Sequence, residues 1–223
     1  MGIKVRAGID GSCDFPGAEP IFTARRAAEE LGKPLMAHIG LPPPTTDTML
    51  PILRKGDILT HTFRGNPNSV LDGKGNPLPE LVEARERGVI VDLGHGSGSF
   101  SFETARKMLD QGFLPDVIST DVHVLSINGP VYDLPTTMSK MLNLGMRLDG
   151  IIRACTHNPA KVIGYEDELG TLREGTTGDI AVLELEEGAF EFRDAFRNKM
   201  VGRKKLHPIL TILKGKILDQ AES

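Results

Sequence analysis

Short apolar runs recur through the first half of the chain, and each ends at a side chain that can bind a metal or carry a proton. The runs are short, rich in branched residues and bounded by polar or glycine-containing segments, which is typical of strands. They are Leu35–Ala37 before His38, Ile58–Thr60 before His61, Val89–Val91 before Asp92, and Val117–Thr120 before Asp121. Burying a carboxylate at a strand end is costly unless a metal or a proton partners it. The pattern therefore predicts one site built from several strand ends.

Segments of helical periodicity separate these strands. The expected helices cover residues 21–31, 47–55, 80–87, 102–111, 134–144 and 148–155, and another short one opens at 158–160. A further strand at 1–8 carries Lys4. The candidate side chains Lys4, His38, His61, His95 and Asp121 lie 34, 23, 34 and 26 residues apart, and one strand–helix unit takes roughly 30 residues. These units predict a parallel sheet with its functional groups at the C-terminal strand ends, either part of a (β/α)8 barrel or an open sheet.

The pattern changes near Gly170. Residues 179–185, 190–196 and 210–218 read as strands joined by turns, so a small β module is expected at the end of the chain. We therefore predict an α/β protein: residues 1–165 form part of a TIM-like barrel, and residues 166–223 form a small β-sandwich segment.

Charge and cysteine content narrow the class of protein. The net charge is −4 and no basic stripe occurs, which argues against nucleic acid and anionic membranes as partners. The two cysteines, Cys13 and Cys155, are far apart and form no C-x-x-C motif. No apolar stretch reaches membrane-spanning length, and the chain does not open with a signal peptide. A cytoplasmic protein with a small-molecule substrate is expected.

The two strand-end histidines and Asp121 are the main metal candidates. A single histidine at such a position is more often a hydrogen-bonded structural residue. Two of them on adjacent strands, with Asp121 further along the sheet, favour a metal, and imidazole is the commonest protein ligand for zinc. A loop or helix-capping role is the alternative for Asp121.

His95 and His123 are candidates for substrate contact. His95 precedes Gly96–Ser99, whose backbone amides could hold an anion; the alternative is a turn that lets the next helix begin. His123 follows Asp121 by two residues and would either support a ligand or face the substrate.

Lys4 is the least usual candidate. A lysine that points into a barrel lumen is desolvated, which lowers its pKa and favours the neutral amine. Such an amine can form a Schiff base, or take up carbon dioxide to become a carbamate that bridges two cations about 3.5–4 Å apart. The alternative is an exposed lysine at a frayed strand.

Taken together, these motifs resemble the amidohydrolase superfamily, and within it the dihydroorotase-like amidohydrolase/deacetylase group. The likeness is carried by Gly2–Arg6, Ala37–Gly40, Thr60–His61, Asp92–Gly96, Ser119–His123, Thr156–Gly164, Gly170–Leu172 and Gly175–Val182. It runs through essentially the whole chain.

The resemblance implies a metal-dependent hydrolase that uses one or two divalent ions, zinc being expected. Lys4 matches the carboxylated lysine that bridges two metals, and His38 and His61 match ligands of the second metal. Asp121 matches the carboxylate that binds the first metal and shuttles a proton. His95 falls where family members contact the substrate. The implied reaction is cleavage of an amide or ester bond in a small acylated compound.

The sequence departs from the family pattern in one respect. Family members open with a β-sandwich segment and a first barrel strand ending in His-x-His, and no His-x-His occurs here. The chain corresponds to strands four to eight, so weak metal binding and slow turnover are expected. Its last strands would lack sandwich partners, leaving open edges that favour a homo-oligomer. The alternatives are a catalytically incomplete remnant that acts as an interaction module, and an open-sheet enzyme that forms a Schiff base on Lys4.

Overall fold

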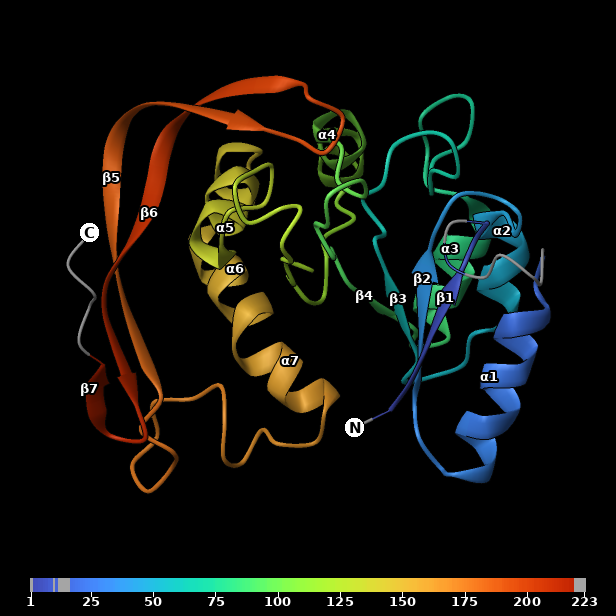
Figure 1. Cartoon of the computed structure of the whole chain (residues 1–223), viewed down its shortest axis with the longest axis horizontal. Coiled ribbons are helices and arrows are strands. Elements are labelled where there is room, and N and C mark those ends of the chain that lie inside the picture. Colours follow the sequence, from blue (N-terminus) through green and yellow to red (C-terminus); the bar gives the residue numbers. More distant parts are fainter. Residues whose placement is uncertain (1, 10, 12–16, 219–223) are drawn as a thin grey trace.

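The computed structural model describes residues 2–9, 11 and 17–218. Cys13 lies outside the described residues. The first half of the chain forms a parallel sheet in the order β1-β2-β3-β4, and the last part forms a separate antiparallel sheet (Figure 1). The parallel strands are β1 (Ile3–Ala7), β2 (Leu35–Ile39), β3 (Ile58–Thr60) and β4 (Ile90–Val91).

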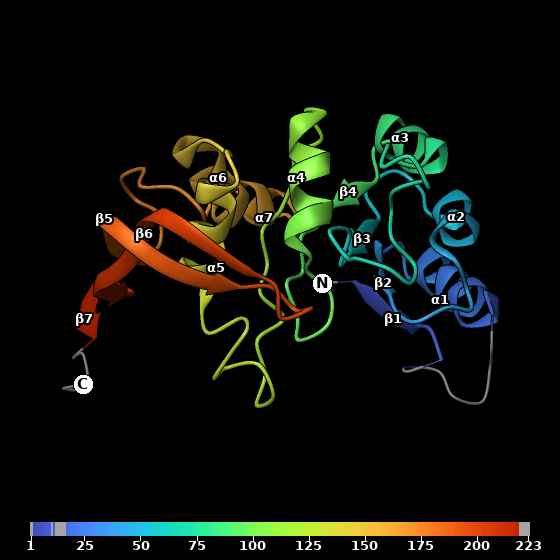
Figure 2. The same cartoon turned by 90° about the horizontal axis from the view of Figure 1, so that it is seen from above.

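Helices connect the parallel strands and follow the outer side of the sheet, as the view from above shows (Figure 2). They are α1 (Glu19–Glu30), α2 (Thr46–Met49) with the 3-10 turn η1 (Leu50–Ile52), α3 (Pro79–Glu86) and α4 (Phe102–Asp110). Helix α4 begins where Ser101 caps it, because the Ser101 hydroxyl accepts a hydrogen bond from the Thr104 amide. The sheet and these helices share one buried apolar core, so the strand ends that carry polar residues are held by packing.

A fifth parallel segment continues the sheet without forming a full strand. The sequence predicted a strand at 116–120, and the structure has a single bridge there, between Asp92 and Val117. Backbone bonds nevertheless run from the Leu93 amide to the Val117 carbonyl (3.0 Å) and from the His95 amide to the Ser119 carbonyl (3.1 Å). The left-handed backbone of Gly94 and Gly96 interrupts regular pairing, which explains the difference.

Three helices follow: α5 (Leu134–Asn143), α6 (Leu148–Cys155) and α7 (His157–Val162). Asp133 caps α5, accepting a hydrogen bond from the Thr136 amide at 2.6 Å. The helices that the sequence predicted at 134–144 and 148–155 end within one residue of the observed ones.

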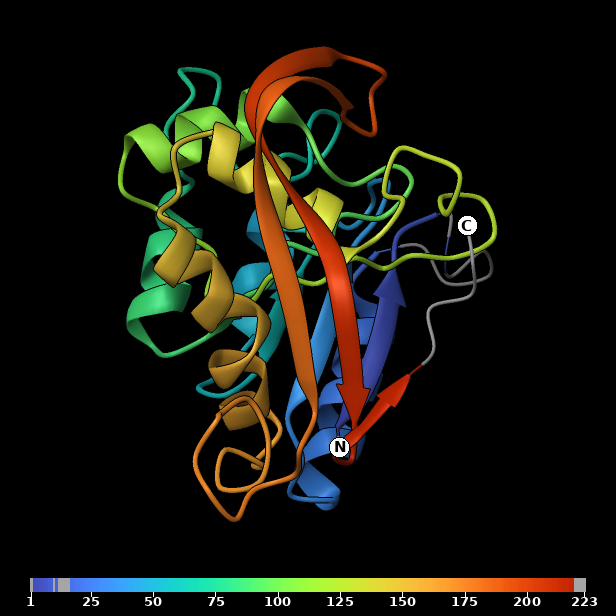
Figure 3. The ribbon, with the colours of Figure 1, turned by 90° about the vertical axis from the view of Figure 1, so that its left-hand side faces the viewer.

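The final part is a long hairpin of β5 (Ile180–Arg193) and β6 (Lys199–Leu213), with the short β7 (Lys216–Leu218) at its edge. Figure 3 shows the hairpin running lengthwise across the face of the molecule that is turned toward the viewer. The sequence predicted separate strands at 179–185 and 190–196, which is wrong: one strand spans both. Register shifts at Val182/Leu183 and Glu187/Phe190 let β5 pass through the segment that reads as a turn. The prediction also missed most of β6.

The hairpin is attached to the first part of the chain at two places. On α5, the Ser139 hydroxyl accepts from the Leu206 amide (2.9 Å), and Asn143 Oδ1 accepts from the Arg203 amide (2.7 Å). At its tip, Asp194 Oδ2 accepts from the Phe102 amide at the start of α4 (3.0 Å).

The predicted α/β organisation, a parallel sheet followed by a separate antiparallel sheet, is confirmed. Assignment of the parallel strands to positions four to eight of a barrel stays a prediction, as does the domain boundary at residue 165. Within the described ranges, no helix combines the length and apolar character needed to cross a membrane.

Candidate functional site

Three predicted residues that are far apart in the sequence lie together at the C-terminal ends of the parallel strands. His38 is in β2, His61 follows β3, and both are buried. Their ring centroids are 4.4 Å apart, with the rings perpendicular. Oδ2 of Asp121 lies 3.7 Å from Nε2 of His61. The structure thus brings His38, His61 and Asp121 to one place, as expected of parallel strand ends.

The hydrogen bonds of His61 define its tautomer. Its Nδ1 bonds the carbonyl oxygen of Gly94, and because a carbonyl can only accept, Nδ1 carries the proton. Burial lowers the pKa of His61, and the positive charges of Lys4 and Arg64 contribute to the lowering. The ring is therefore neutral, with a lone pair on Nε2. Among the described residues, Nε2 of His61 has no hydrogen-bond partner.

This arrangement suits a cation. The lone pair of His61 faces a carboxylate oxygen of Asp121 at 3.7 Å, so two electron-pair donors face each other without a proton between them. A backbone carbonyl bonded to the other ring nitrogen is the usual support of a metal-binding histidine. In the part of the chain that the structure describes, no group of three or more His, Cys, Asp or Glu side chains is arranged to hold a metal. The donor types fit a divalent ion, but the described geometry is not a closed cage.

Two residues of this site have backbone conformations that are strained for residues other than glycine. His61 (φ 68°) and Asp121 (φ 45°) both lie in the left-handed region, which costs of order 1–3 kcal/mol per residue. Gly94 and Gly96 are also left-handed and pack directly on the site. A Cβ on Gly94 would collide with the Thr60 hydroxyl, and one on Gly96 would lie 3.3 Å from Asp121 Oδ2. The glycines are therefore needed for close approach.

His95 lies deeper than the sequence predicted. It is fully buried and stacks on Phe100, with centroids 4.6 Å apart. Its Nδ1 bonds the Gly96 carbonyl (2.9 Å), and its Nε2 lies 2.8 Å from Nζ of Lys140. Burial, with the charge of Lys140, lowers the pKa of His95 to about 3. Both ring nitrogens are engaged inside the protein, so its role in substrate binding stays a prediction.

His123, by contrast, is exposed on the loop that follows Asp121. Its Nδ1 accepts from the Leu125 amide (3.3 Å), and its backbone amide donates to the Ser126 hydroxyl (3.0 Å). The exposed side chain is therefore accessible to a ligand.

Lys4 has the exposed environment that the sequence analysis left as the alternative to a desolvated one, and its role as a metal ligand stays a prediction. The side chain is exposed because β1 is an edge strand, paired only with β2 in the described sheet. In the pairing of β1 with β2, Lys4 lies opposite Met36, and Arg6 lies opposite His38 two residues further on. Its charge nevertheless contributes to lowering the pKa of His61, so it acts on the site from nearby.

Two buried ionisable residues were not among the candidate site residues of the sequence analysis. Asp92 accepts hydrogen bonds from the hydroxyls of Thr60 (2.6 Å) and Ser119 (2.8 Å), and burial raises its pKa. It thereby ties neighbouring strand ends together. Lys140 on α5 is the other. Its only signal in the sequence is a lysine set between Met138 and Met141 in an amphipathic helix.

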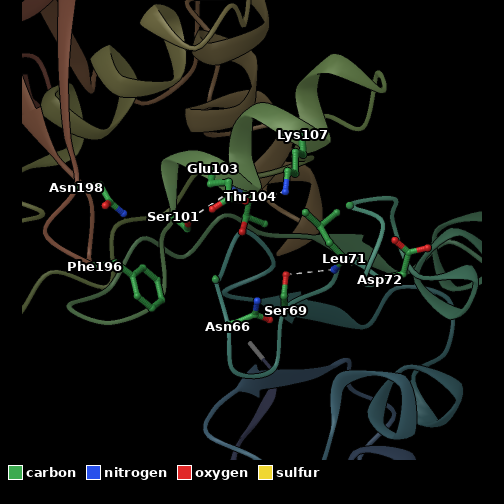
Figure 4. A pocket seen from close by; sticks show the side chains of 13 residues that line it. Asn66, Ser69, Leu71, Asp72, Ser101, Glu103, Thr104, Lys107, Phe196 and Asn198 are labelled. Carbon is green, nitrogen blue, oxygen red and sulfur yellow. Dashed lines mark hydrogen bonds and ion pairs between the residues drawn. The ribbon is translucent and has the colours of Figure 1, made fainter.

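A pocket of about 410 Å³ lies apart from these residues. Figure 4 shows it between the loop after β3, the start of α4 and the hairpin tip, with Asn66, Ser69, Thr104, Lys107 and Phe196 among its lining. His38, His61 and Asp121 do not line it. The strand-end chemistry and this polar pocket are therefore separate features.

Comparisons with known proteins indicate one family. The sequence model of the Amidohydrolase family matches residues 18–218. A deacetylase from Brucella anthropi is 39% identical over 197 residues, covering 87% of this chain and 48% of the relative. A deacetylase from Enterococcus faecalis is 35% identical over 222 residues, covering 98% of this chain and 60% of the relative.

Two solved structures are also similar to this chain. One described as an adenine deaminase superposes with a TM-score of 0.92 at 34% identity, covering 98% of this chain and 60% of that one. Another, described as a dihydroorotase, has a TM-score of 0.87 at 34% identity, covering 96% and 56%. The chain thus spans about half to three-fifths of the length of these proteins. None of the comparisons supports the interaction-module alternative.

Proposed function

Because the chain belongs to the amidohydrolase family, we propose that it is a hydrolase that cleaves an amide bond in a small acylated compound. The observation that carries the proposal is the neutral His61, whose Nε2 lone pair faces the Asp121 carboxylate at 3.7 Å. The names of the related proteins, two deacetylases, support an acyl group as one side of the scissile bond. An ester of similar shape is the second substrate type.

The residues that would hold a divalent ion, zinc by donor type, are His38, His61 and Asp121, with Lys4 as a carboxylated, bridging ligand. When bound, such an ion makes a water molecule more acidic and polarises the substrate carbonyl. Carboxylation of Lys4 requires its neutral amine, so this part of the proposal depends on a bound ion that stabilises the carbamate. A Schiff base on Lys4 is disfavoured, because its side chain lacks the desolvation that such chemistry uses.

Asp121 is the proposed proton carrier. Its side chain is 46% exposed, so its carboxylate can reach both a water molecule and a substrate. It would take a proton from the attacking water at Oδ2 and return it to the leaving nitrogen. His61 is not assigned this role, because its Nδ1 is already protonated and bonded to Gly94 and its Nε2 lone pair would be used to hold the ion. The division of roles follows from these contacts.

Substrate contact is assigned to His123, which is exposed directly after Asp121. His95 would act through the backbone of Gly96, since its ring is engaged internally. The absence of nucleic-acid and membrane partners, a cytoplasmic location and assembly into a homo-oligomer all stay predictions.

The test is hydrolysis of a panel of N-acetyl amino acids by the full chain supplied with zinc. We expect slow turnover that chelation abolishes and that Asp121→Asn lowers by at least about a hundredfold, the usual scale for general acid–base catalysis. Asp110→Asn, at the exposed end of α4, is the matched control and should keep the wild-type rate. Equal rates in Asp121→Asn and wild type would exclude the proposed role of Asp121.

A further inference from the structure

Lys140 is a fully buried lysine that the proposed chemistry does not use. Its side chain is 0% exposed. Its Nζ donates a hydrogen bond to the Pro130 carbonyl at 2.6 Å and lies 2.8 Å from Nε2 of His95. Burying an ammonium group is costly even when it is hydrogen-bonded, so its presence here calls for a role.

The direction of the hydrogen bonds is determined by the partners. Nδ1 of His95 bonds the Gly96 carbonyl, which can only accept, so Nδ1 holds the ring proton. Nε2 of His95 then has the lone pair and accepts from Lys140. Since burial keeps His95 neutral, the lysine holds the ring in one tautomer and one orientation.

The backbone of His95 and Gly96 in turn holds the segment that carries Asp121. The His95 amide donates to the Ser119 carbonyl (3.1 Å), and the Gly96 amide donates to the Thr120 carbonyl (2.9 Å). Asp121 follows directly, in a left-handed conformation that its surroundings must impose.

The second bond of Lys140 holds the other end of the same loop. The loop that begins after Asp121 returns at Pro130, whose carbonyl is bound by Lys140. One amine therefore holds both the segment before Asp121, through His95, and the end of the loop after it.

The C-terminal hairpin contributes to this arrangement. The negative charges of Asp194, at the hairpin tip, and Asp133, which caps α5, oppose the effect of burial on the pKa of Lys140. Asp194 is itself buried and bonded to the start of α4. The hairpin thus supplies part of the charge balance of Lys140.

We propose that Lys140 is a positioning residue, which holds His95 and Pro130 so that Asp121 stays opposite His61. The inference rests on the proposed role of Asp121, but its structural consequence can be measured without any activity.

The first measurement is amide hydrogen exchange in the full chain. Lys140→Met removes both hydrogen bonds, to His95 and to Pro130, at nearly constant volume. We expect the amides of His95 and Gly96 to exchange at least about tenfold faster, with the β2 amides unchanged. Lys161→Met, at an exposed lysine of α7, should match wild type. Unchanged exchange at His95 and Gly96, or equal acceleration throughout the sheet, would overturn the proposal. Lys140→Gln, which keeps an N–H donor group on a shorter and uncharged side chain, should give intermediate exchange and serves if Lys140→Met does not fold.

The second measurement is steady-state kinetics on the best N-acetyl substrate. Displacing Asp121 impairs the chemical step more than binding, so we expect kcat to fall at least about tenfold and KM to change less than about threefold in Lys140→Met. A wild-type kcat in this variant would contradict the proposal. If the wild-type chain hydrolyses nothing, the proposed function fails, while the exchange result still decides whether Lys140 holds the loop.

Discussion

Nε2 of His61 and Oδ2 of Asp121 face each other at 3.7 Å although 60 residues separate them in the sequence. The proton of His61 is on Nδ1, bonded to Gly94, so its Nε2 presents a lone pair to the Asp121 carboxyl group. Two facing acceptors on strained backbone are poorly explained by stability alone, and they are well explained by a shared ligand. The site is therefore expected to gain stability when a cation binds.

Zinc should raise the unfolding temperature of the wild-type chain. A ligand at a hundred times its dissociation constant stabilises the folded state by about 2.7 kcal/mol, a shift of several degrees for a chain of this size. His61→Asn and Asp121→Asn each remove a donor and should reduce the shift by more than half. His157→Asn, at the start of α7, should leave it unchanged. Differential scanning calorimetry with and without zinc measures this, and an equal shift in all four proteins would argue against the site.

Gly96→Ala should destabilise the fold and disturb Asp121. The residue has φ +54°, and an added Cβ would lie 3.3 Å from both Asp121 Oδ2 and Cε1 of His61. The left-handed conformation alone costs an alanine roughly 1–2 kcal/mol. Gly98→Ala is the matched control, because a Cβ there meets nothing within 4 Å, and it should be neutral or slightly stabilising. Urea denaturation gives both values, and similar stabilities of the two variants would contradict the close approach.

Lys140 should make stability rise with pH in the alkaline range. Burial lowers its pKa from 10.5 to about 7, so between these values the unfolded chain holds a proton that the folded chain has released. The free energy of unfolding then increases with pH, by at most about 1.4 kcal/mol per pH unit from this group. Lys140→Met lacks this contribution.

The measurement is the free energy of unfolding of Lys140→Met and wild type from about pH 6 to about pH 10. The free energy of unfolding of the variant, relative to that of wild type, should be highest at the acidic end of this range, where the folded wild type carries the buried charge. This difference should become less favourable to the variant as the pH rises. Lys161→Met should run parallel to wild type. A difference that does not depend on pH would mean that Lys140 titrates normally.

The strand ends could be predicted from the sequence because parallel strands bring their C-termini to one edge. That rule needs only the apolar runs and the polar residue after each, and it placed His38, His61 and Asp121 correctly relative to one another. The helices were predictable for a similar reason, since caps such as Asp133 and apolar periodicity are local signals.

Other features depend on packing between distant segments. The bond of Lys140 to His95 spans 45 residues, and neither residue type reveals the other in the sequence. Exposure of Lys4 depends on which strand lies beside β1, which strand propensity does not encode. The long β5 was missed because its register shifts carry it past Gly188, where the local pattern favours a turn.

The hairpin tip provides the last prediction. Asp194 is 1% exposed, and its carboxylate accepts from the amides of Phe102, Phe196 and Asn198. Asp194→Ala leaves these donors without the acceptor, at about 1–3 kcal/mol for each one that stays buried. We therefore expect it to lower the free energy of unfolding by more than about 3 kcal/mol. It should also speed amide exchange at the start of α4, whereas Asp167→Ala, at an exposed position, should do neither.

Because Asp194 also balances the charge of Lys140, exchange at His95 should rise in Asp194→Ala as well. Faster amide exchange that is confined to the hairpin and the start of α4 would instead show that the tip is attached to the first part of the chain without supporting the loop that carries Asp121.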